Sequence, residues 1–349
     1  MNAPHPPPRL TSLAHGGGCG CKLAPGVLQQ IIARSAGGVV PPGLLVGIET
    51  SDDAAVYRIS ETQAIVATTD FFMPVVDDPF DFGAIAATNA ISDVYAMGGT
   101  PLFALALVGM PVDKLPVETI RLILEGGESV CRRAGIPVAG GHSIDSVEPI
   151  YGLVVIGLVD PRHLKRNADA RAGDALILGK ALGVGMYSAA LKKDRLAAEQ
   201  YRVMLDSTTQ LNTPGAELGR MPGVHALTDV TGFGLLGHLL EVCRGSDLGA
   251  RIEWDRVPLL PGVLDFARQA GRTGASVRNW ASYGAQVDLG GHGEAQRDLL
   301  TDPQTSGGLL VSCAPSAVDE VLSLFRAHGF ARAAVIGEMR AGDARVHVR

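Results

Sequence analysis

Cysteine is scarce in this sequence, and it follows neither a disulfide nor a zinc pattern. The 349 residues hold five cysteines, a sparse and odd number that is typical of a reducing compartment. Cys131, Cys243 and Cys313 lie far apart, so no second pair joins Cys19 and Cys21 at the spacing of a structural zinc site. We therefore expect five free thiols, with these three buried as small apolar side chains.

Long apolar runs and clusters of basic residues are also missing. No stretch approaches 18 uninterrupted apolar residues, and the opening "MNAPHPPPRL" has prolines where a signal peptide has an apolar segment. The net charge is −6 and no basic run stands out, which argues against binding to nucleic acid or to an anionic membrane. The 46% hydrophobic content is that of a globular chain with a large core. These features predict a cytoplasmic protein.

The two common phosphate-binding loops are absent as well. No G-x-G-x-x-G follows a predicted strand, since "GVGMYS" is the nearest match and fails, and no Walker motif occurs. The 44 glycines lie mostly as pairs at the ends of apolar runs, where close approach of the backbone to a ligand is the usual reason for them. Any phosphate chemistry must therefore use other devices.

The segment "HGGGCGCK", residues 15–22, places two thiols and a lysine after a run of glycines. Such a run loses more conformational entropy on ordering than other sequences do, so it predicts a segment that orders only part of the time. A mobile segment that carries Cys19, Cys21 and Lys22 has the properties of a lid with reactive groups. We expect residues 1–22 to form a flexible N-terminal segment.

The remaining chain is predicted to be α/β and to form two domains. A buried strand is expected at Ala64–Phe72, and polar residues after 165 mark the crossing to a second domain whose first strand is Ala175–Leu178. We expect domains at 23–164 and 165–349. The other predicted elements are helices at 25–35, 80–99, 117–135 and 192–212, strands at 101–110 and 151–160, and a loop at 138–145.

Several aspartates follow predicted strands or lie on a helix. Asp70 ends a buried strand, and Asn89 and Asp93 share one face of the next helix. Converging carboxylates with an amide suit Mg²⁺, which binds phosphates. Taken singly, each aspartate could equally be a helix cap or a turn residue. Asp229 in "LTDVTGFG" repeats the pattern, whereas Asp302 is better explained by an Asp-Pro turn.

A pair of glycines precedes His142 in "AGGHSID". The backbone N–H groups of such a loop could face an anion, although a lone Gly-Gly is weak evidence. A histidine hydrogen-bonded inside the loop is the interpretation we favour for His142 over a ligand.

Seven motifs, in order along nearly the whole chain, resemble those of the selenophosphate synthetases (selenide, water dikinases). They are "HGGGCGCK", "DDAAVY", "TTDFFMP", "ATNAISDVYAMGG", "AGGHSID", "LTDVTGFGLLGH" and "DPQTSGGLL". The resemblance implies a two-domain fold similar to aminoimidazole ribonucleotide synthetase, with N-terminal domains that pair into a homodimer around a shared β-barrel. It also implies conversion of ATP, selenide and water into selenophosphate, AMP and phosphate, which supplies activated selenium for selenocysteine and selenouridine. Mg²⁺ and a monovalent cation such as K⁺ are the implied cofactors.

The resemblance also carries residue roles. It implies that Cys19 is the catalytic cysteine and Lys22 the essential lysine, with the pKa of Cys19 lowered by that lysine and a metal. The implied nucleotide contacts are Lys22, Thr50, Ser51, Asp52, Asp70, Asp93, Gly141, His142 and Ser143. The implied metal contacts are Asp53, Asp70, Asp93 and Asp229.

Two other functions remain open at the level of sequence. Another ATP-using member of the same fold group, such as a purine-pathway synthetase or thiamine-phosphate kinase, would share the aspartates but lack the thiol-bearing segment. A metal- or selenium-binding carrier would use Cys19 and Cys21 as chelators, and it leaves the aspartates unexplained.

Overall fold

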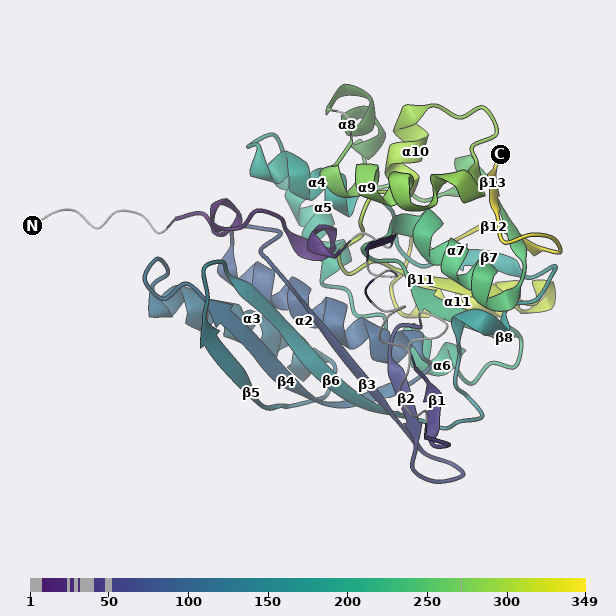
Figure 1. Cartoon of the computed structure of the whole chain (residues 1–349), viewed down its shortest axis with the longest axis horizontal. Coiled ribbons are helices and arrows are strands. Elements are labelled where there is room, and N and C mark those ends of the chain that lie inside the picture. Colours follow the sequence, from purple (N-terminus) through teal and green to yellow (C-terminus); the bar gives the residue numbers. More distant parts are fainter. Residues whose placement is uncertain (1–7, 24–25, 28–30, 32–40, 48–51, 271) are drawn as a thin grey trace, which may run out of the picture.

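The structure is a computed structural model that describes residues 8–23, 26–27, 31, 41–47, 52–270 and 272–349. It contains two mixed sheets, each covered by helices, and the N-terminal segment runs between the two halves (Figure 1). The helix expected at 25–35 lies almost entirely outside the described residues. Among the residues that are described, no helix combines the length and the apolar composition of a membrane span.

Within the described ranges the first sheet has six strands in the order β1-β2-β3-β6-β4-β5, of which only β4 and β5 run parallel. The strands are β1 (Leu44–Val46), β2 (Ala55–Arg58), β3 (Ala64–Phe72), β4 (Thr100–Met110), β5 (Val138–Asp145) and β6 (Ile150–Val159). The strands expected at 64–72, 101–110 and 151–160 are confirmed. The segment 138–145 was expected to be a loop, which is wrong, because it forms the edge strand β5.

The second sheet has seven strands in the order β10-β13-β9-β12-β7-β11-β8. They are β7 (Ala175–Leu178), β8 (Val224–Asp229), β9 (Gly249–Ile252), β10 (Val287–Asp288), β11 (Leu309–Cys313), β12 (Ala334–Arg340) and β13 (Val346–Val348). The strand predicted at Ala175–Leu178 is confirmed. The boundary expected near residue 165 falls between β6 and β7, and the division of the chain into domains stays a prediction.

Ten α-helices are labelled in the described residues. They are α2 (Pro79–Ala96), α3 (Val117–Arg133), α4 (Val184–Lys192), α5 (Ala198–Thr208), α6 (Pro214–Leu218), α7 (Gly234–Ser246), α8 (Val263–Ala270), α9 (Gly274–Tyr283), α10 (Glu294–Leu300) and α11 (Val318–Ala327). The single helical tract expected at 192–212 is wrong at its start, since residues 193–197 separate α4 from α5. Short 3₁₀ turns cover η1 (Leu10–Leu13), η2 (Gly18–Cys21) and η3 (Asn167–Asp169).

Helix α2 is the central element of the first half. Its N-terminus is capped by Asp78, whose Oδ1 accepts the backbone N–H of Asp81 at 2.9 Å, and Pro79 occupies the first turn. Fifteen of its eighteen residues are buried, because the sheet, α3 and the second half all pack against it. A helix buried on every side can carry polar residues only where they have partners, which makes its polar residues candidates for a site.

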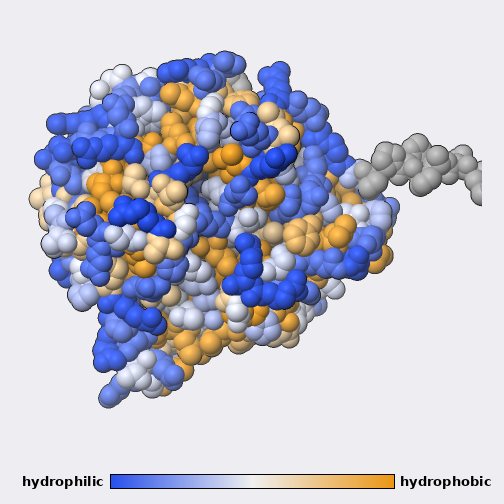
Figure 2. Space-filling view, turned by 180° about the vertical axis from the view of Figure 1, so that it is seen from behind, coloured by the Kyte–Doolittle hydropathy of each residue, from blue (hydrophilic) through white to orange (hydrophobic). Residues whose placement is uncertain are grey.

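The two long helices approach each other through glycines. A methyl group added at Gly126 of α3 would overlap the carbonyl oxygen of Phe80, and one added at Gly83 of α2 would overlap that of Ile123. No helix of the described residues covers the opposite face of the first sheet (Figure 1). From behind, Figure 2 shows hydrophilic residues interspersed with apolar ones.

Substituting Gly126→Ala is therefore expected to destabilise the protein by about 1–3 kcal/mol, the usual cost of overpacking a core. Chemical denaturation followed by circular dichroism measures the change. Gly293→Ala is the matched control, since its methyl meets only Gln296 Oε1 at 3.5 Å. Equal midpoints for the two variants would contradict this account of the helix contact.

Candidate functional site

The site lies where α2, the end of β3, the end of β8 and the N-terminal segment meet. Strand β3 carries Thr68 and Asp70 on its buried face, because alternate residues of a strand point to the same side. Helix α2 carries Asn89 and Asp93 one turn apart, as the sequence predicted. Strand β8 ends at Asp229, which is also buried.

The carboxamide of Asn89 connects three separate segments. Its Nδ2 donates to Asp70 Oδ2 at 2.6 Å. Its Oδ1 accepts the thiol of Cys19 at 3.2 Å and the backbone N–H of Ser306 at 2.7 Å. Asn89 is fully buried, so these bonds form away from water, where a broken one is costly. One side chain therefore fixes the relative positions of the thiol, a carboxylate and a distant turn.

Cys19 belongs to the cysteine loop, which we define as residues 14–22. Its backbone N–H donates to Thr305 Oγ1 at 3.0 Å, and only 1% of the residue is exposed. The preceding Gly18 has φ +54°, and a methyl there would overlap Thr305 Oγ1. At Gly17 a methyl would lie 2.5 Å from the carbonyl oxygen of Pro74. The glycines let the loop close tightly enough to bury the thiol.

The expected lowering of the Cys19 pKa is wrong for this arrangement. Burial raises the pKa of the thiol well above its usual value, and the attraction of Lys22, which acts in the expected direction, is the smaller effect. Burial likewise raises the pKa of Cys21, which is half-buried. The thiol of Cys19 is therefore protonated here and acts as a hydrogen-bond donor.

Lys22 reaches from the cysteine loop to the carboxylates. Its Nζ lies 3.2 Å from Asp70 Oδ2, with 36% of the lysine side chain still exposed. Desolvation disfavours the ammonium charge, but the attraction of Asp70 and of the carboxylates beyond it raises the pKa of Lys22 well above its usual value. The lysine is thus charged and aimed at the acidic cluster.

Three further carboxylates lie close enough to interact. Asp93 Oδ2 accepts the hydroxyl of Thr68 at 2.5 Å, and Asp229 Oδ2 accepts that of Ser92 at 2.5 Å. Asp53 Oδ1 accepts the hydroxyl of Thr228 at 2.9 Å. Each aspartate accepts a hydrogen bond from a neutral hydroxyl group. Its carboxylate is still close enough to repel the neighbouring carboxylates.

The pKa values of these three aspartates are raised. Burial is the main cause for each, and repulsion between neighbouring carboxylates adds to it for Asp53 and Asp93. For Asp229, hydrogen bonding from Ser92 opposes the effect of burial without cancelling it. The site therefore holds more negative charge than its surroundings stabilise.

This chemistry fits a divalent cation. Oδ2 of Asp53 is buried and has no hydrogen-bond partner among the described residues. A hard cation takes carboxylate oxygens as ligands and would offset the repulsion. In the present side-chain positions, however, no three His, Cys, Asp or Glu side chains of the described chain form a ready ligand shell.

Asp52 binds the backbone of a distant turn, and its charge also helps to raise the pKa of Asp53. Its Oδ1 accepts the backbone N–H of Asn167 at 2.7 Å, which ties it to the 3₁₀ turn η3. The predicted nucleotide contacts Thr50 and Ser51 lie outside the described residues.

Gly141, His142 and Ser143 are exposed on the edge strand β5. Asp70, Leu153, Ala106 and Gly141 form one row across β3, β6, β4 and β5. Three strand spacings place Gly141 about 14 Å from Asp70 within the same chain. The structure does not bring these residues to the carboxylates, and His142 is not held inside a loop as expected.

Sequence reasoning expected a turn at Asp302 but gave no role to Thr305 and Ser306 of the buried turn, which we define as residues 301–308. Thr305 and Ser306 hold the cysteine loop and Asn89, and Ser306 has φ +53°, unusual for a residue other than glycine. Behind it, Lys180 Nζ donates to Ser306 O at 2.9 Å and Gln210 O at 2.7 Å. Burial lowers the pKa of Lys180 to about 7. For Lys180, a lysine two residues after the apolar strand "ALIL" was the available signal.

The smaller expectations are mostly confirmed. All five cysteines are free, and Cys131, Cys243 and Cys313 are buried. Asp302 is structural rather than part of the site, because its Oδ2 accepts the backbone N–H of Met186 at 3.1 Å in the first turn of α4. Burial raises the pKa of Asp302 to about 7.

Comparison with known proteins agrees on family and fold. Residues 51–159 match the N-terminal domain, and residues 171–349 the C-terminal domain, of AIR synthase related proteins. The chain is 68% identical over 342 residues to a selenide, water dikinase of Dechloromonas aromatica, covering 97% of this chain and 98% of the relative. A relative of the same name from Rhizobium meliloti is 58% identical, with 98% of each chain covered.

Solved structures share the fold at low identity. Thiamine-monophosphate kinase from Stenotrophomonas maltophilia superposes with a TM-score of 0.65 at 20% identity, covering 94% of this chain and 96% of that one. Hydrogenase maturation protein HypE in complex with ATP superposes with a TM-score of 0.63 at 19% identity, covering 88% and 86%. At such identities the likeness concerns the two-domain α/β fold alone.

Proposed function

The chain belongs to the selenide, water dikinase family, and from this premise we propose that the residues held around Asn89 carry out the family's reaction. That reaction makes selenophosphate from selenide, ATP and water. One observation carries the proposal: the Cys19 thiol and the Asp70 carboxylate, which is also the partner of Lys22, bind the same carboxamide beside the acidic cluster. A chelating carrier would need none of these carboxylates, and a kinase of the wider fold group would not need the thiol.

Mg²⁺ is the cation proposed for the acidic cluster. Asp53, Asp70, Asp93 and Asp229 would hold it, by small side-chain shifts that bring their oxygens together. When bound, the ion neutralises phosphate charge and fixes the phosphates for transfer. Asp53 is the clearest candidate, because its buried Oδ2 lacks a partner in the described chain. K⁺ is kept as a further proposal from the family resemblance.

Lys22 supplies the second positive charge. In this structure it pairs with Asp70, but the side chain is flexible and partly exposed. The negative oxygens of ATP would compete for it and draw it onto the phosphates. Lys22 would then reduce the repulsion between ATP and an incoming selenium anion. Closure of the cysteine loop excludes water, which would otherwise accept the phosphoryl group first.

We propose that Cys19 contacts the selenium atom of the substrate. Because its thiol is buried and protonated, it can donate to an anionic selenium atom as it now donates to Asn89. That contact places the selenium between the thiol and the phosphates.

A homodimer is proposed from the uncovered face of the first sheet. Large apolar side chains stand on or beside that sheet with about half their surface exposed, among them Tyr57 (46%), Phe71 (50%) and Ile144 (57%). A second copy would cover them, and a shared β-barrel is the form that the resemblance suggests. Since Gly141 is about 14 Å from Asp70 in its own chain, the nucleotide contacts assigned to Gly141–Ser143 would serve a site of the second copy.

The domain division at 22 and 164, the nucleotide contacts at Thr50 to Asp52 and the cytoplasmic location stay predictions.

Replacing Cys19 by serine is expected to abolish selenophosphate formation while ATP still binds, because the carboxylates and Lys22 remain. Cys21→Ser is the matched control and should retain most activity. Lys22→Ala should slow the transfer by about 100-fold or more, the usual loss of one charge-stabilising donor. Phosphorus NMR for selenophosphate and assays of AMP, with and without selenide, measure both products. A fully active Cys19→Ser protein would refute the assignment.

The metal proposal predicts a link between pH and stability. Folding raises the pKa values of Asp53, Asp93 and Asp229, so the folded state binds protons more tightly than the unfolded state. Stability of the metal-free protein should therefore fall as pH rises from the unfolded values through the folded ones. Asp53→Asn should reduce this loss of stability with rising pH. It should therefore stabilise the metal-free protein at pH ~8, a value well above ordinary aspartate pKa values.

Thermal unfolding with EDTA or Mg²⁺ gives the measurement. Mg²⁺ should raise the midpoint of the unmodified protein and raise that of Asp53→Asn much less. Asp113→Asn, on an exposed turn, should behave like the unmodified protein. An equal rise in all three proteins would remove Asp53 from the metal site.

The dimer is tested by Phe71→Glu. A charge on the uncovered sheet face should give a monomer in sedimentation experiments at micromolar concentration, because burying an unpaired carboxylate in an interface is unfavourable. Val117→Glu, 81% exposed at the start of α3, is the control that should stay dimeric. An active monomer of the unmodified protein would contradict the proposal.

A further inference from the structure

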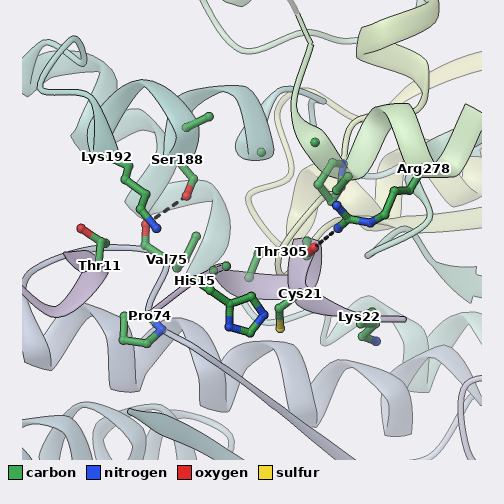
Figure 3. A pocket seen from close by; sticks show the side chains of 18 of the residues that line it. Thr11, His15, Cys21, Lys22, Pro74, Val75, Ser188, Lys192, Arg278 and Thr305 are labelled. Atoms are coloured by element: carbon green, nitrogen blue, oxygen red, sulfur yellow. Dashed lines mark hydrogen bonds between the residues drawn. The ribbon is translucent and has the colours of Figure 1, made fainter. Parts of the chain in front are cut away.

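A cavity of about 580 Å³ lies outside the cysteine loop, between the loop and helices α4 and α9. We call it the outer cavity. Lys192 of α4 and Arg278 of α9 stand on opposite sides of it, with His15 and Cys21 of the loop between them (Figure 3). The carboxylate cluster of the site lies on the other side of the loop.

The lining of the outer cavity is positively charged. It includes Lys22, Lys192, Arg278 and His15, and no aspartate or glutamate is among the described residues that line it. Neither Lys192 nor Arg278 lies within ion-pair distance of a carboxylate in the described chain. The other two do: His15 lies 2.8 Å from Glu148, and Lys22 lies 3.2 Å from Asp70. Lys192 and Arg278 therefore favour a small anion in the outer cavity, although the chain as a whole carries a net charge of −6.

The two cations hold the loop without losing their charge. Lys192 Nζ donates to Ala14 O at 2.8 Å, and Arg278 donates to Gly20 O at 2.8 Å. A carbonyl oxygen carries only a partial charge, so it leaves most of the field of each cation directed into the cavity. Lys192 and Arg278 therefore bind the cysteine loop near its two ends, and they also make the electrostatic potential of the outer cavity more positive.

The outer cavity is separated from the site by a single layer of chain. Thr305 lines the cavity and also accepts the N–H of the buried Cys19. Lys22 lines it too, while its ammonium touches Asp70 on the inner side. An ion in the cavity would thus reach the thiol and the phosphates by a movement of the glycine-rich loop alone.

We propose that the outer cavity binds hydroselenide, the monoanion in which selenide exists in neutral water, before it enters the site. This inference rests on the proposed function, because it concerns the selenium substrate of that reaction. The cavity is larger than one such ion requires, so charge rather than shape selects the ligand. Cations on the outside concentrate the anion, whereas the acidic cluster and ATP on the inside would repel it. The half-buried thiol of Cys21 offers a soft donor beside the cations.

Alkylation of Cys21 tests the charge of the cavity without any assay of activity. Iodoacetate is an anion and iodoacetamide is neutral, and the same thiolate attacks both and displaces iodide, so the ratio of their rates does not depend on the Cys21 pKa. Mass spectrometry of the Cys21 peptide gives each rate. Lys192→Gln/Arg278→Gln should lower the ratio by about tenfold, the scale of electrostatic concentration in a charged cleft. Glutamine keeps a donor for the loop carbonyls.

Two control proteins separate charge from structure. Lys193→Gln/Arg195→Gln removes two positive charges next to α4 but outside the outer cavity, and it should leave the ratio unchanged. Lys192→Arg/Arg278→Lys keeps both charges and should also keep the ratio. An unchanged ratio in Lys192→Gln/Arg278→Gln, or an equal fall in the first control, would overturn the proposal.

Steady-state kinetics then test whether the cations of the outer cavity act on the binding of selenide. In Lys192→Gln/Arg278→Gln the KM for selenide should rise about tenfold while the KM for ATP stays unchanged, and added salt should raise the selenide KM of the unmodified protein. An equal rise in the ATP KM would assign the cations to the nucleotide and overturn the proposal. If the unmodified protein made no selenophosphate, the function itself would fail, whatever the alkylation ratio.

Discussion

A concentration of buried negative charge is the constraint on which the rest of the structure depends. Asp53, Asp70, Asp93 and Asp229 approach from four separate parts of the chain, and within the described residues only Lys22 forms an ion pair with any of them. Hydroxyl donors such as Thr68 and Ser92 reduce the cost but add no positive charge. Burial and mutual repulsion keep the pKa values of three of these groups high. In the proposed site a divalent cation would offset this charge, and in this structure Lys22 supplies one positive charge at Asp70.

The cysteine loop is held closed by contacts that do not depend on its own sequence preference. Glycine gives the loop its freedom, but Asn89, Thr305, Lys192 and Arg278 bind it at four points. Most of these contacts are single hydrogen bonds, each worth about 1 kcal/mol net. Each bond is weak alone, so opening the loop requires no single strong interaction to break. The same closure that buries Cys19 raises its pKa, so the state that protects the thiol from water is also the state in which it is protonated.

The sequence predicted those parts of the site that depend on local pattern. Strand β3 and helix α2 were found because their apolar spacing is strong, and their aspartates followed from position at a strand end or on one helix face. Segment 138–145 was taken for a loop because its glycines mask a strand, and Gly140 and Gly141 have φ of +145° and +154°. Thr305 and Lys180 were missed, since their contacts join residues 286 and 126 positions apart. The direction of the Cys19 pKa shift could not be predicted either, because it depends on burial, which is a property of the folded chain.

The two sides of the cysteine loop carry opposite charge, and this ordering constrains the route of each substrate. In the proposed reaction ATP and its metal would bind on the inner side, where the carboxylates would hold the cation and Lys22 would leave Asp70 for the phosphates. A small anion is repelled from that side until the phosphates and carboxylates are neutralised, but it is attracted to the outer side by Lys192 and Arg278. Lys22 lines both sides, so its transfer from Asp70 to the phosphates would shift positive charge inward once ATP is bound. The loop then separates the two charged substrates until the inner side has become attractive to an anion, which gives an order of binding without any further element of structure.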